Sequence, residues 1–122
     1  MNTAITRMFG IKYPIICGAM QWLCKHELCA AVSNAGGMGN LTAGNYDTEE
    51  DFRGAIRATR ALTDRPFMVG ITILPSVRIT PGHHQMYLRV CAEEKVAGIE
   101  VSGAPIDKAA GPEYIDMLKK AG

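Results

Sequence analysis

Segments typical of β-strands and segments typical of α-helices alternate along the chain, and this order most restricts its fold. Each predicted strand is a short apolar run, and each predicted helix carries apolar residues at helical spacing. The predicted strands are residues 14–17, 38–41, 67–74 and 98–102, and the predicted helices are residues 25–35, 47–62, 84–95 and 113–120. Such alternation indicates parallel strands with right-handed crossovers, so we predict an α/β fold of about four β-α units.

Two architectures fit this order of elements. One is a small doubly wound sheet, and the other is the N-terminal half of a (β/α)₈ barrel. A complete barrel of this kind typically needs about 250 residues, whereas the chain has 122 residues. The alternation by itself leaves both architectures open.

The end of the first predicted strand is a candidate ligand site. A short amphipathic segment, residues 5–10, leads into this strand and is predicted to act as a lid or a plug. Pro14 begins the strand, and Gly18 and Ala19 follow it, so the backbone can turn sharply or let a flat ligand approach closely. The carboxyl ends of parallel strands are the usual ligand sites of α/β proteins. An ordinary turn after a buried strand is the alternative.

The composition excludes several classes of protein. The chain is 48% hydrophobic and 20% charged, which is typical of a globular protein and not of a disordered one. Its formal net charge of +1 indicates neither a nucleic acid nor a membrane surface as partner. No apolar run approaches the ~20 residues of a membrane span, and the N-terminus lacks the pattern of a signal peptide. We therefore expect a cytoplasmic protein.

The cysteines and histidines do not form a metal-binding pattern. The four cysteines, Cys17, Cys24, Cys29 and Cys91, match no zinc spacing, and in a reducing compartment they are expected to be free thiols. Cys17 stands at a strand end, where it can line a pocket, but no basic residue lies beside it to activate the thiol. No catalytic role is assigned to any histidine, and no metal is expected.

Two further features each have two interpretations. The glycines of residues 36–39 resemble a phosphate-binding loop, but they follow a helix and enter a strand, whereas dinucleotide-binding loops do the reverse. A helix stop is therefore the favoured interpretation. Glu100 lies inside an otherwise apolar strand. It is either an inward-facing site residue or, together with Ser102, part of a solvated strand end.

Several blocks of residues agree in order, spacing and type with the start of one enzyme family. The blocks are residues 11–16 (IKYPII), 18–20 (GAM), 27–28 (EL), 30–39 (AAVSNAGGMG) and 62–67 (LTDRPF). In these blocks the chain resembles the nitronate monooxygenases, formerly called 2-nitropropane dioxygenases. The same family includes the flavin-dependent enoyl-acyl-carrier-protein reductase II. The resemblance covers most of the chain.

The resemblance implies a TIM barrel that binds FMN without a covalent link. In that family the segment that matches residues 18–20 lies against the flavin ring, and the end of the third predicted strand also contributes. Small residues at a strand end let backbone amides reach the flavin edge. The residues expected to bind the cofactor are therefore Gly18, Ala19, Met20, Gly70 and Thr72.

Two positions depart from the family pattern. Gly70 stands where the family usually has an Asn, so a polar contact is missing there. Either Thr72 compensates in part or flavin binding is weaker. Asn40 stands where the family commonly has a large apolar residue. It is expected either to place a polar group in the pocket or to face a loop.

The length of the chain is a larger departure. In the family, the catalytic His and the glycine-rich loops that hold the flavin phosphate lie beyond the region matched here, so both are expected beyond Gly122. We therefore expect residues 1–122 to be a single partial domain, apparently truncated, which lacks the catalytic His and is inactive alone. A half barrel also exposes an edge strand, through which the chain can form a homo-oligomer.

The function implied for the parent protein is that of an FMN-dependent oxidoreductase. It is expected to oxidise small molecules, alkyl nitronates or nitroalkanes, with O₂. One alternative is an NAD(P)H-dependent enoyl-acyl-carrier-protein reductase of the same flavin fold. The other is a non-catalytic half barrel that self-associates.

Overall fold

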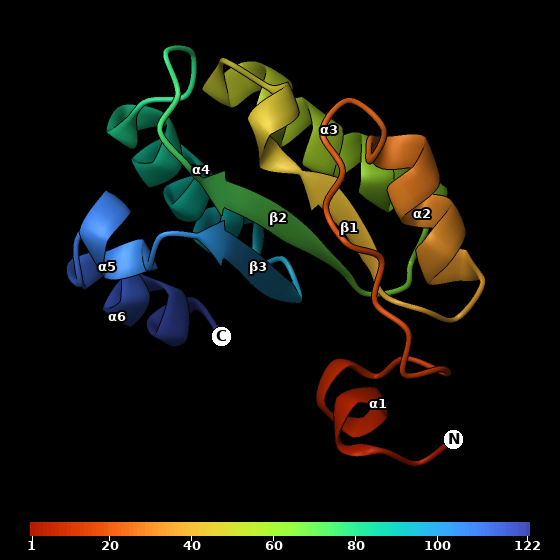
Figure 1. Ribbon diagram of the computed structural model, residues 1–122. Helices are drawn as coiled ribbons and strands as arrows, with labels where there is room; N and C mark the ends of the chain where they lie inside the picture. Colours follow the sequence, from red (N-terminus) through yellow and green to blue (C-terminus); the bar gives the residue numbers. More distant parts are fainter.

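A three-stranded parallel sheet forms the centre of the molecule. The computed structural model describes residues 1–108 and 110–122. The strands β1 (Gly39–Thr42), β2 (Phe67–Ile73) and β3 (Gly98–Gly103) are adjacent in the order β1-β2-β3. Four helices accompany the strands (Figure 1): α2 (His26–Asn34) precedes β1, α3 (Glu49–Leu62) and α4 (Pro81–Glu94) connect the strands, and α6 (Glu113–Ala121) follows β3 and packs on α4. All four predicted helices and three of the four predicted strands are thereby confirmed.

Two short helical elements lie outside the predicted helices and strands. They are the 3-10 helix η1 (Ala43–Asn45) after β1 and the helix α5 (Ile106–Ala109) after β3. Both follow the carboxyl end of a strand. No helix among the described residues is long and apolar enough to cross a membrane.

The prediction of a buried strand over residues 14–17 is wrong. Within this segment a single bridge joins Ile16 to Met38 in parallel, with Cys17 N donating to Met38 O at 3.0 Å. Ile15 and Ile16 are 61% and 42% exposed. The segment has the β1 region as its strand neighbour on one side, and no described strand pairs with its other edge. A regular buried strand in a parallel sheet needs a neighbouring strand on each side. The apolar pattern of residues 14–17 does not show whether both neighbours are present.

The two faces of the sheet differ in chemistry because successive side chains point to opposite sides of a strand. One face is apolar and packs against the helices, with Leu41, Val69 and Ile71 against Phe52, Ile56 and Leu88 of α3 and α4. The other face, called here the polar face, carries Asn40, Thr42, Gly70, Thr72, Glu100 and Ser102. The register sets Gly70 beside Glu100 and Thr72 beside Ser102.

The glycines of residues 36–39 end α2 and allow close packing, as the helix-stop interpretation predicts. Gly36 has a φ of 97°, which lies in the left-handed region that favours glycine. A Cβ atom added at Gly39 would overlap the backbone carbonyl oxygen of Cys29. These glycines therefore serve the junction between α2 and β1.

The helix α1 (Ala4–Phe9) closes the amino-terminal end of the sheet. Phe9 and Ile5 pack on a small core of Ile11, Met38 and Met68. In Figure 1, α1 (red) lies below the sheet, at the end where the strands begin. Of the two roles predicted for residues 5–10, the plug is the one observed.

Candidate functional site

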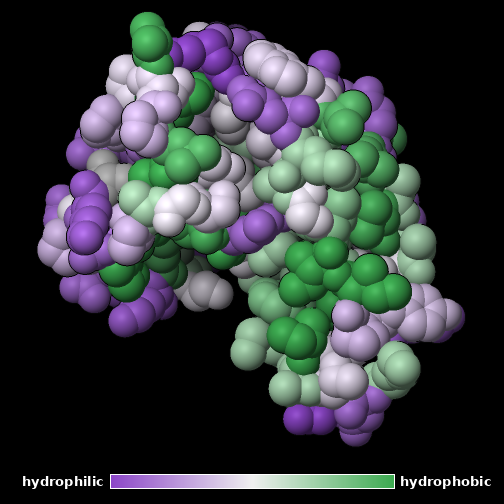
Figure 2. Space-filling view, viewed as in Figure 1, coloured by the Kyte–Doolittle hydropathy of each residue, from purple (hydrophilic) through white to green (hydrophobic). Residues whose placement is uncertain are grey.

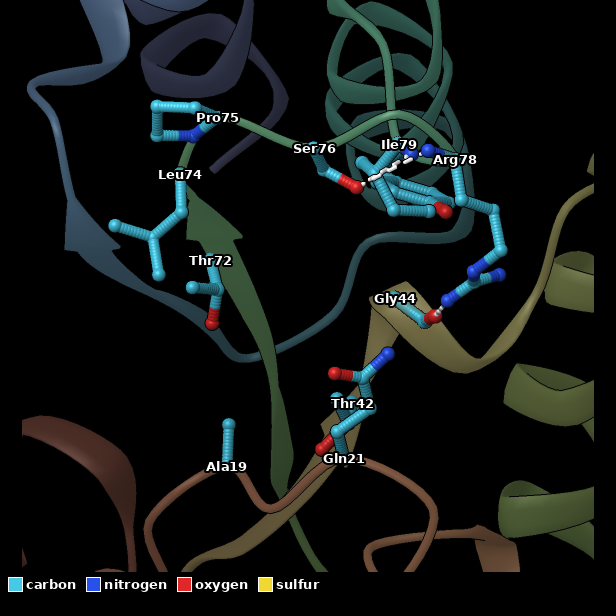
Figure 3. Close-up of a pocket in the computed structure, with 11 residues that line it drawn as sticks. Ala19, Gln21, Thr42, Gly44, Thr72, Leu74, Pro75, Ser76, Arg78 and Ile79 are labelled. Atoms are coloured by element: carbon cyan, nitrogen blue, oxygen red, sulfur yellow. Dashed lines mark hydrogen bonds between the residues drawn. The ribbon is translucent and has the colours of Figure 1, made fainter.

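A cavity of about 280 Å³ opens at the carboxyl ends of β1 and β2 (Figure 3). Its walls come from the segment before α2, from the ends of both strands and from the β2–α4 connection. The lining residues are Ala19, Gln21, Thr42, Gly44, Thr72, Leu74, Pro75, Ser76, Arg78, Ile79 and Tyr87. This end of a parallel sheet is where α/β folds bind ligands, so the cavity is the candidate site.

The segment of residues 17–21, called here the N-terminal loop, crosses the polar face at the floor of the cavity. A Cβ atom added at Gly70 would overlap the Cβ of Ala19 and would lie 2.9 Å from Asn40 Oδ1. Gly70 is therefore buried beneath the loop. The absence of a side chain at position 70 lets the loop and Asn40 approach β2 closely.

Glu100 fastens the N-terminal loop to the sheet. Its Oε2 atom accepts a hydrogen bond from Ala19 N at 3.3 Å and a second one from Asn40 Nδ2. Asn40 is fully buried, and its Oδ1 has no hydrogen-bond partner among the described residues. Glu100 thus faces inward, and one buried acceptor beside it is left unsatisfied.

Three hydroxyl groups complete the polar face above this layer. Thr42 Oγ1 donates to Met20 O at 3.2 Å and holds the far side of the N-terminal loop. Thr72 Oγ1 and Ser102 Oγ are 3.1 Å apart and form a hydrogen bond across β2 and β3. Figure 3 shows Thr72 and Ala19 on opposite sides of the open space. The floor of the cavity therefore presents hydroxyl groups and a fixed stretch of backbone.

Arg78 forms the opposite wall of the cavity. Its guanidinium pairs with Asp47, donates to Gly44 O (dashed in Figure 3) and lies 5.2 Å from the ring centre of Trp22. Behind it, the hydroxyl of Tyr87 donates to Tyr46 O at 2.5 Å. Burial raises the pKa of Tyr87 to about 12, so this phenol stays neutral. The positive charge of Arg78 is thus balanced by Asp47, which lies beside the wall.

Two cysteines lie close together near the N-terminal loop: Cys17 begins the loop, and Cys24 lies three residues beyond its end. Cys17 Sγ and Cys24 Sγ are 4.0 Å apart, and both thiols donate to Gly18 O. Burial, reinforced by Cys24 and Glu100, raises the pKa of Cys17. The thiols are free, as predicted.

The predicted cofactor-binding residues have different places in this site. Ala19 and Thr72 line the cavity, and Gly18 and Met20 are exposed on the N-terminal loop beside it. Gly70 lies underneath. Their contact with a cofactor stays a prediction.

The histidines of this chain are outside the lining of the cavity. His26 begins α2, and His83 and His84 lie in the first turn of α4. None of them lines the cavity. The catalytic His that the family resemblance implies is expected beyond Gly122, outside the 122 residues of the chain, and it stays a prediction.

The contact between Asn40 and Glu100 and the position of Arg78 in the cavity wall were not predicted from the sequence. Polar residues at alternate positions of β1 and β3 could have indicated that Asn40 and Glu100 share one face of the sheet. Arg78 lies in a connection rich in turn-forming residues, where no periodicity marks a side chain.

Comparison with known proteins places the chain in a family. A family model described as nitronate monooxygenase matches residues 2–106. The nitronate monooxygenase of Pseudomonas aeruginosa is 42% identical over 71 residues, which are 58% of this chain and 20% of that protein. A (3aS,4S,5R,7aS)-5-hydroxy-7a-methyl-1-oxo-octahydro-1H-indene-4-carboxyl-CoA dehydrogenase of Rhodococcus jostii is 31% identical over all 122 residues, which are 31% of its length.

Solved structures of the same kind share the fold. A variant of FabK from Thermotoga maritima matches with a TM-score of 0.78 and 33% identity, over 100% of this chain and 37% of that chain. Nitroalkane oxidase from Streptomyces ansochromogenes matches with a TM-score of 0.73 and 25% identity, over 98% of this chain and 40% of that chain.

The chain thus spans about a third of the length of these relatives and has the fold of part of a TIM barrel, not of a doubly wound sheet. It belongs to the nitronate monooxygenase family of oxidoreductases.

Proposed function

We propose that this chain supplies the first β-α units of an FMN-dependent oxidoreductase that oxidises alkyl nitronates or related small carbon acids with O₂. The observation that carries the proposal is the cavity at the carboxyl ends of β1 and β2, with the N-terminal loop fixed across its floor. Nitronate monooxygenases and FabK proteins are in general flavoproteins, which supports a flavin as the occupant.

The residues present fit the ring of a flavin better than its phosphate. The cavity volume of about 280 Å³ is near the lower end of the range for small-molecule sites, about 300–1,000 Å³. Gly18 leaves its side of the loop open, because no atom lies within 4 Å of a Cβ added there. Arg78 is the one charged residue of the described cavity wall, and Asp47 already neutralises it. Ring binding is therefore assigned to this chain, and phosphate binding to residues outside it.

A bound flavin supplies the capacity to accept and return electrons. The residues of this chain orient it. Glu100 and Thr42 hold the backbone of the N-terminal loop on both sides of Ala19. Thr72 offers a hydroxyl from β2. Because none of the three histidines lines the cavity, the proton-transfer group is assigned to a part of the protein beyond Gly122, and the chain alone is expected to be inactive.

Titration of the chain with FMN and with riboflavin, followed by flavin fluorescence, tests this assignment. Both ligands are expected to bind weakly and with equal affinity, because they share the ring and differ in the phosphate. Gly18→Val is expected to abolish binding by filling the open side of the loop. Gly54→Val on α3, where an added Cβ also meets no atom within 4 Å, is the matched control. Absence of binding, or binding unaffected by Gly18→Val, would contradict the proposal.

A second candidate is the reduction of an enoyl thioester with NAD(P)H. Two observations favour it: the FabK match covers the entire chain, and the dehydrogenase of R. jostii that aligns over all 122 residues acts on a carboxyl-CoA compound by its name. Oxygen consumption with alkyl nitronates, measured against NAD(P)H oxidation with an enoyl thioester, separates the two reactions in a protein that contains the complete barrel.

A non-catalytic role in self-association is the third candidate. Figure 2 shows hydrophobic side chains gathered over the N-terminal segment beside β1. Ile15, Trp22 and Leu23 there are 61%, 59% and 66% exposed. A second copy of the chain is the proposed occupant, because β3 also has an open edge. Sedimentation should then show a dimer that Trp22→Ser weakens, and a concentration-independent monomer would exclude this role.

A further inference from the structure

Two thiols face each other across the base of the N-terminal loop. Cys17 Sγ lies 4.0 Å from Cys24 Sγ, and both groups donate to the same oxygen, Gly18 O, at 3.6 and 3.5 Å. A disulfide has an S–S distance of about 2.0 Å. Because the two sulfur atoms already point to one side of the loop, small side-chain rotations can close the remaining gap.

The environments of the cysteines differ in a way that favours this pair. Cys17 is half-buried, so a small reagent can reach it, whereas Cys24 is fully buried. Cys91 lies apart on α4 and is also buried. Burial raises the pKa of Cys17 and raises that of Cys29 to about 12, so these two thiols stay mostly protonated at neutral pH.

We propose that Cys17 and Cys24 form an oxidation site, at which a two-electron oxidant converts the pair into an intramolecular disulfide. With diamide, a diazene, the sulfur of Cys17 adds to one nitrogen of the N=N bond. The sulfur of Cys24 then attacks the sulfur of Cys17 and displaces the hydrazine product. Two thiol hydrogens pass to the two nitrogens, one S–S bond forms, and the N=N bond becomes an N–N bond.

The disulfide would close a ring around six residues, 18–23, which include most of the N-terminal loop. Its formation requires no bound cofactor and is therefore independent of the proposed function. The oxidised loop would be tied at its base, next to the contacts that Ala19 and Met20 make with Glu100 and Thr42.

The experiment is oxidation of the folded chain by diamide at a pH of about 8.5, near the usual pKa of cysteine. The intact mass is expected to fall by the mass of two hydrogen atoms. Titratable thiols, counted after unfolding, should fall from the four present in the reduced chain to two. Peptide mapping without reduction should yield one cross-linked peptide that joins Cys17 to Cys24.

Three variants make the assignment specific. Cys17→Ser changes a half-buried residue and should prevent the loss of mass, and Cys24→Ala should do the same. Cys91→Ser is the matched control and should still lose two hydrogens. A cross-link that joins Cys24 to Cys29, a disulfide between two chains, or four titratable thiols after oxidation of the folded chain would each overturn the proposal.

Discussion

The two faces of the sheet are built by different means. The helix-covered face is apolar, buried over β1 and β2, and packed by contacts that spread over many residues. The polar face holds the N-terminal loop with a few directed hydrogen bonds, chiefly to Glu100 and Thr42. Stability therefore resides mainly in the first face. The second face has the exposed hydroxyl groups and open space that a ligand requires.

The largest expected effect is on the helix-covered face. Phe52 of α3 is completely buried and lies 5.1 Å from the ring of Tyr87, edge to face. Phe52→Ala should reduce the free energy of unfolding by about 3–5 kcal/mol, because it leaves a cavity in a well-packed core. Thr72→Ala on the polar face, where the side chain is exposed, should change it by less than about 0.5 kcal/mol. Urea unfolding measures the loss of stability of both variants. Similar losses for the two variants would contradict the difference between the two faces.

The next effect lies where the N-terminal loop meets β2. Gly70→Ala places a methyl group onto Ala19 Cβ and close to Asn40. We expect a loss of about 1–3 kcal/mol from overpacking, measured by urea unfolding. The control Gly54→Ala, in an open position on α3, should instead stabilise the chain by up to about 1 kcal/mol. Equal effects of the two substitutions would show that the loop does not press on Gly70.

A matched pair of variants at Glu100 tests the hydrogen bonds of the polar face. Both Ala19 N and Asn40 Nδ2 donate to one oxygen of Glu100, so the single amide oxygen of Glu100→Gln can replace it. Glu100→Leu offers no acceptor and leaves the buried amide of Asn40 unpaired. The expected loss of stability is about 1–3 kcal/mol for Leu and well below about 1 kcal/mol for Gln. A loss for Gln as large as that for Leu would mean that the charge of Glu100, and not hydrogen bonding, fastens the loop.

The smallest expected effect is a dependence of stability on pH through His84. This residue of α4 is 4% exposed, and neither ring nitrogen has a hydrogen-bond partner among the described residues. Burial lowers the pKa of His84 below its ordinary value of 6.5. The unfolded chain therefore takes up a proton before the folded chain does, and stability should fall as the pH drops below 6.5.

His84→Leu is the comparison for this pH dependence. The variant should lose less stability than the original chain when urea unfolding is compared at pH values of about 7 and 5. Acidic residues with lowered pKa values, such as Glu93 and Glu94, also respond to acid, but they are common to both proteins. Their contribution cancels in the difference. Parallel pH profiles would show that His84 does not carry the effect.

Sequence patterns correctly predicted the helices and strands whose formation depends on residues close to one another in the sequence. The helices α2, α3 and α4 and the strands β1, β2 and β3 follow from apolar spacing and from end signals such as the cap at Thr48, whose side chain accepts from Asp51 N. The predicted strand at residues 14–17 failed, because its burial depends on a partner for its outer edge. Periodicity carries no information about that partner.

The candidate site was predicted only in outline. Small residues after the first apolar run identified Ala19, and the end of β2 identified Thr72. The contact between Asn40 and Glu100 joins residues 60 apart in the sequence, and no local rule connects them. Each residue is unusual on its own, Glu100 as a charge in an apolar strand and Asn40 as a departure from the family. Only the register of the sheet shows that these two residues are in contact.

The bond from Ala19 N to Glu100 spans 81 residues and has a consequence for the order of folding. Contacts between residues distant in sequence form slowly, because the intervening chain must first be organised. The pairs β1–β2 and β2–β3, with their helices, join neighbouring segments and can form earlier. During synthesis, the N-terminal loop leaves the ribosome first among the parts of the site but acquires its partner only after residue 100 has emerged. The floor of the cavity is therefore expected to be the last part of the chain to take its final shape.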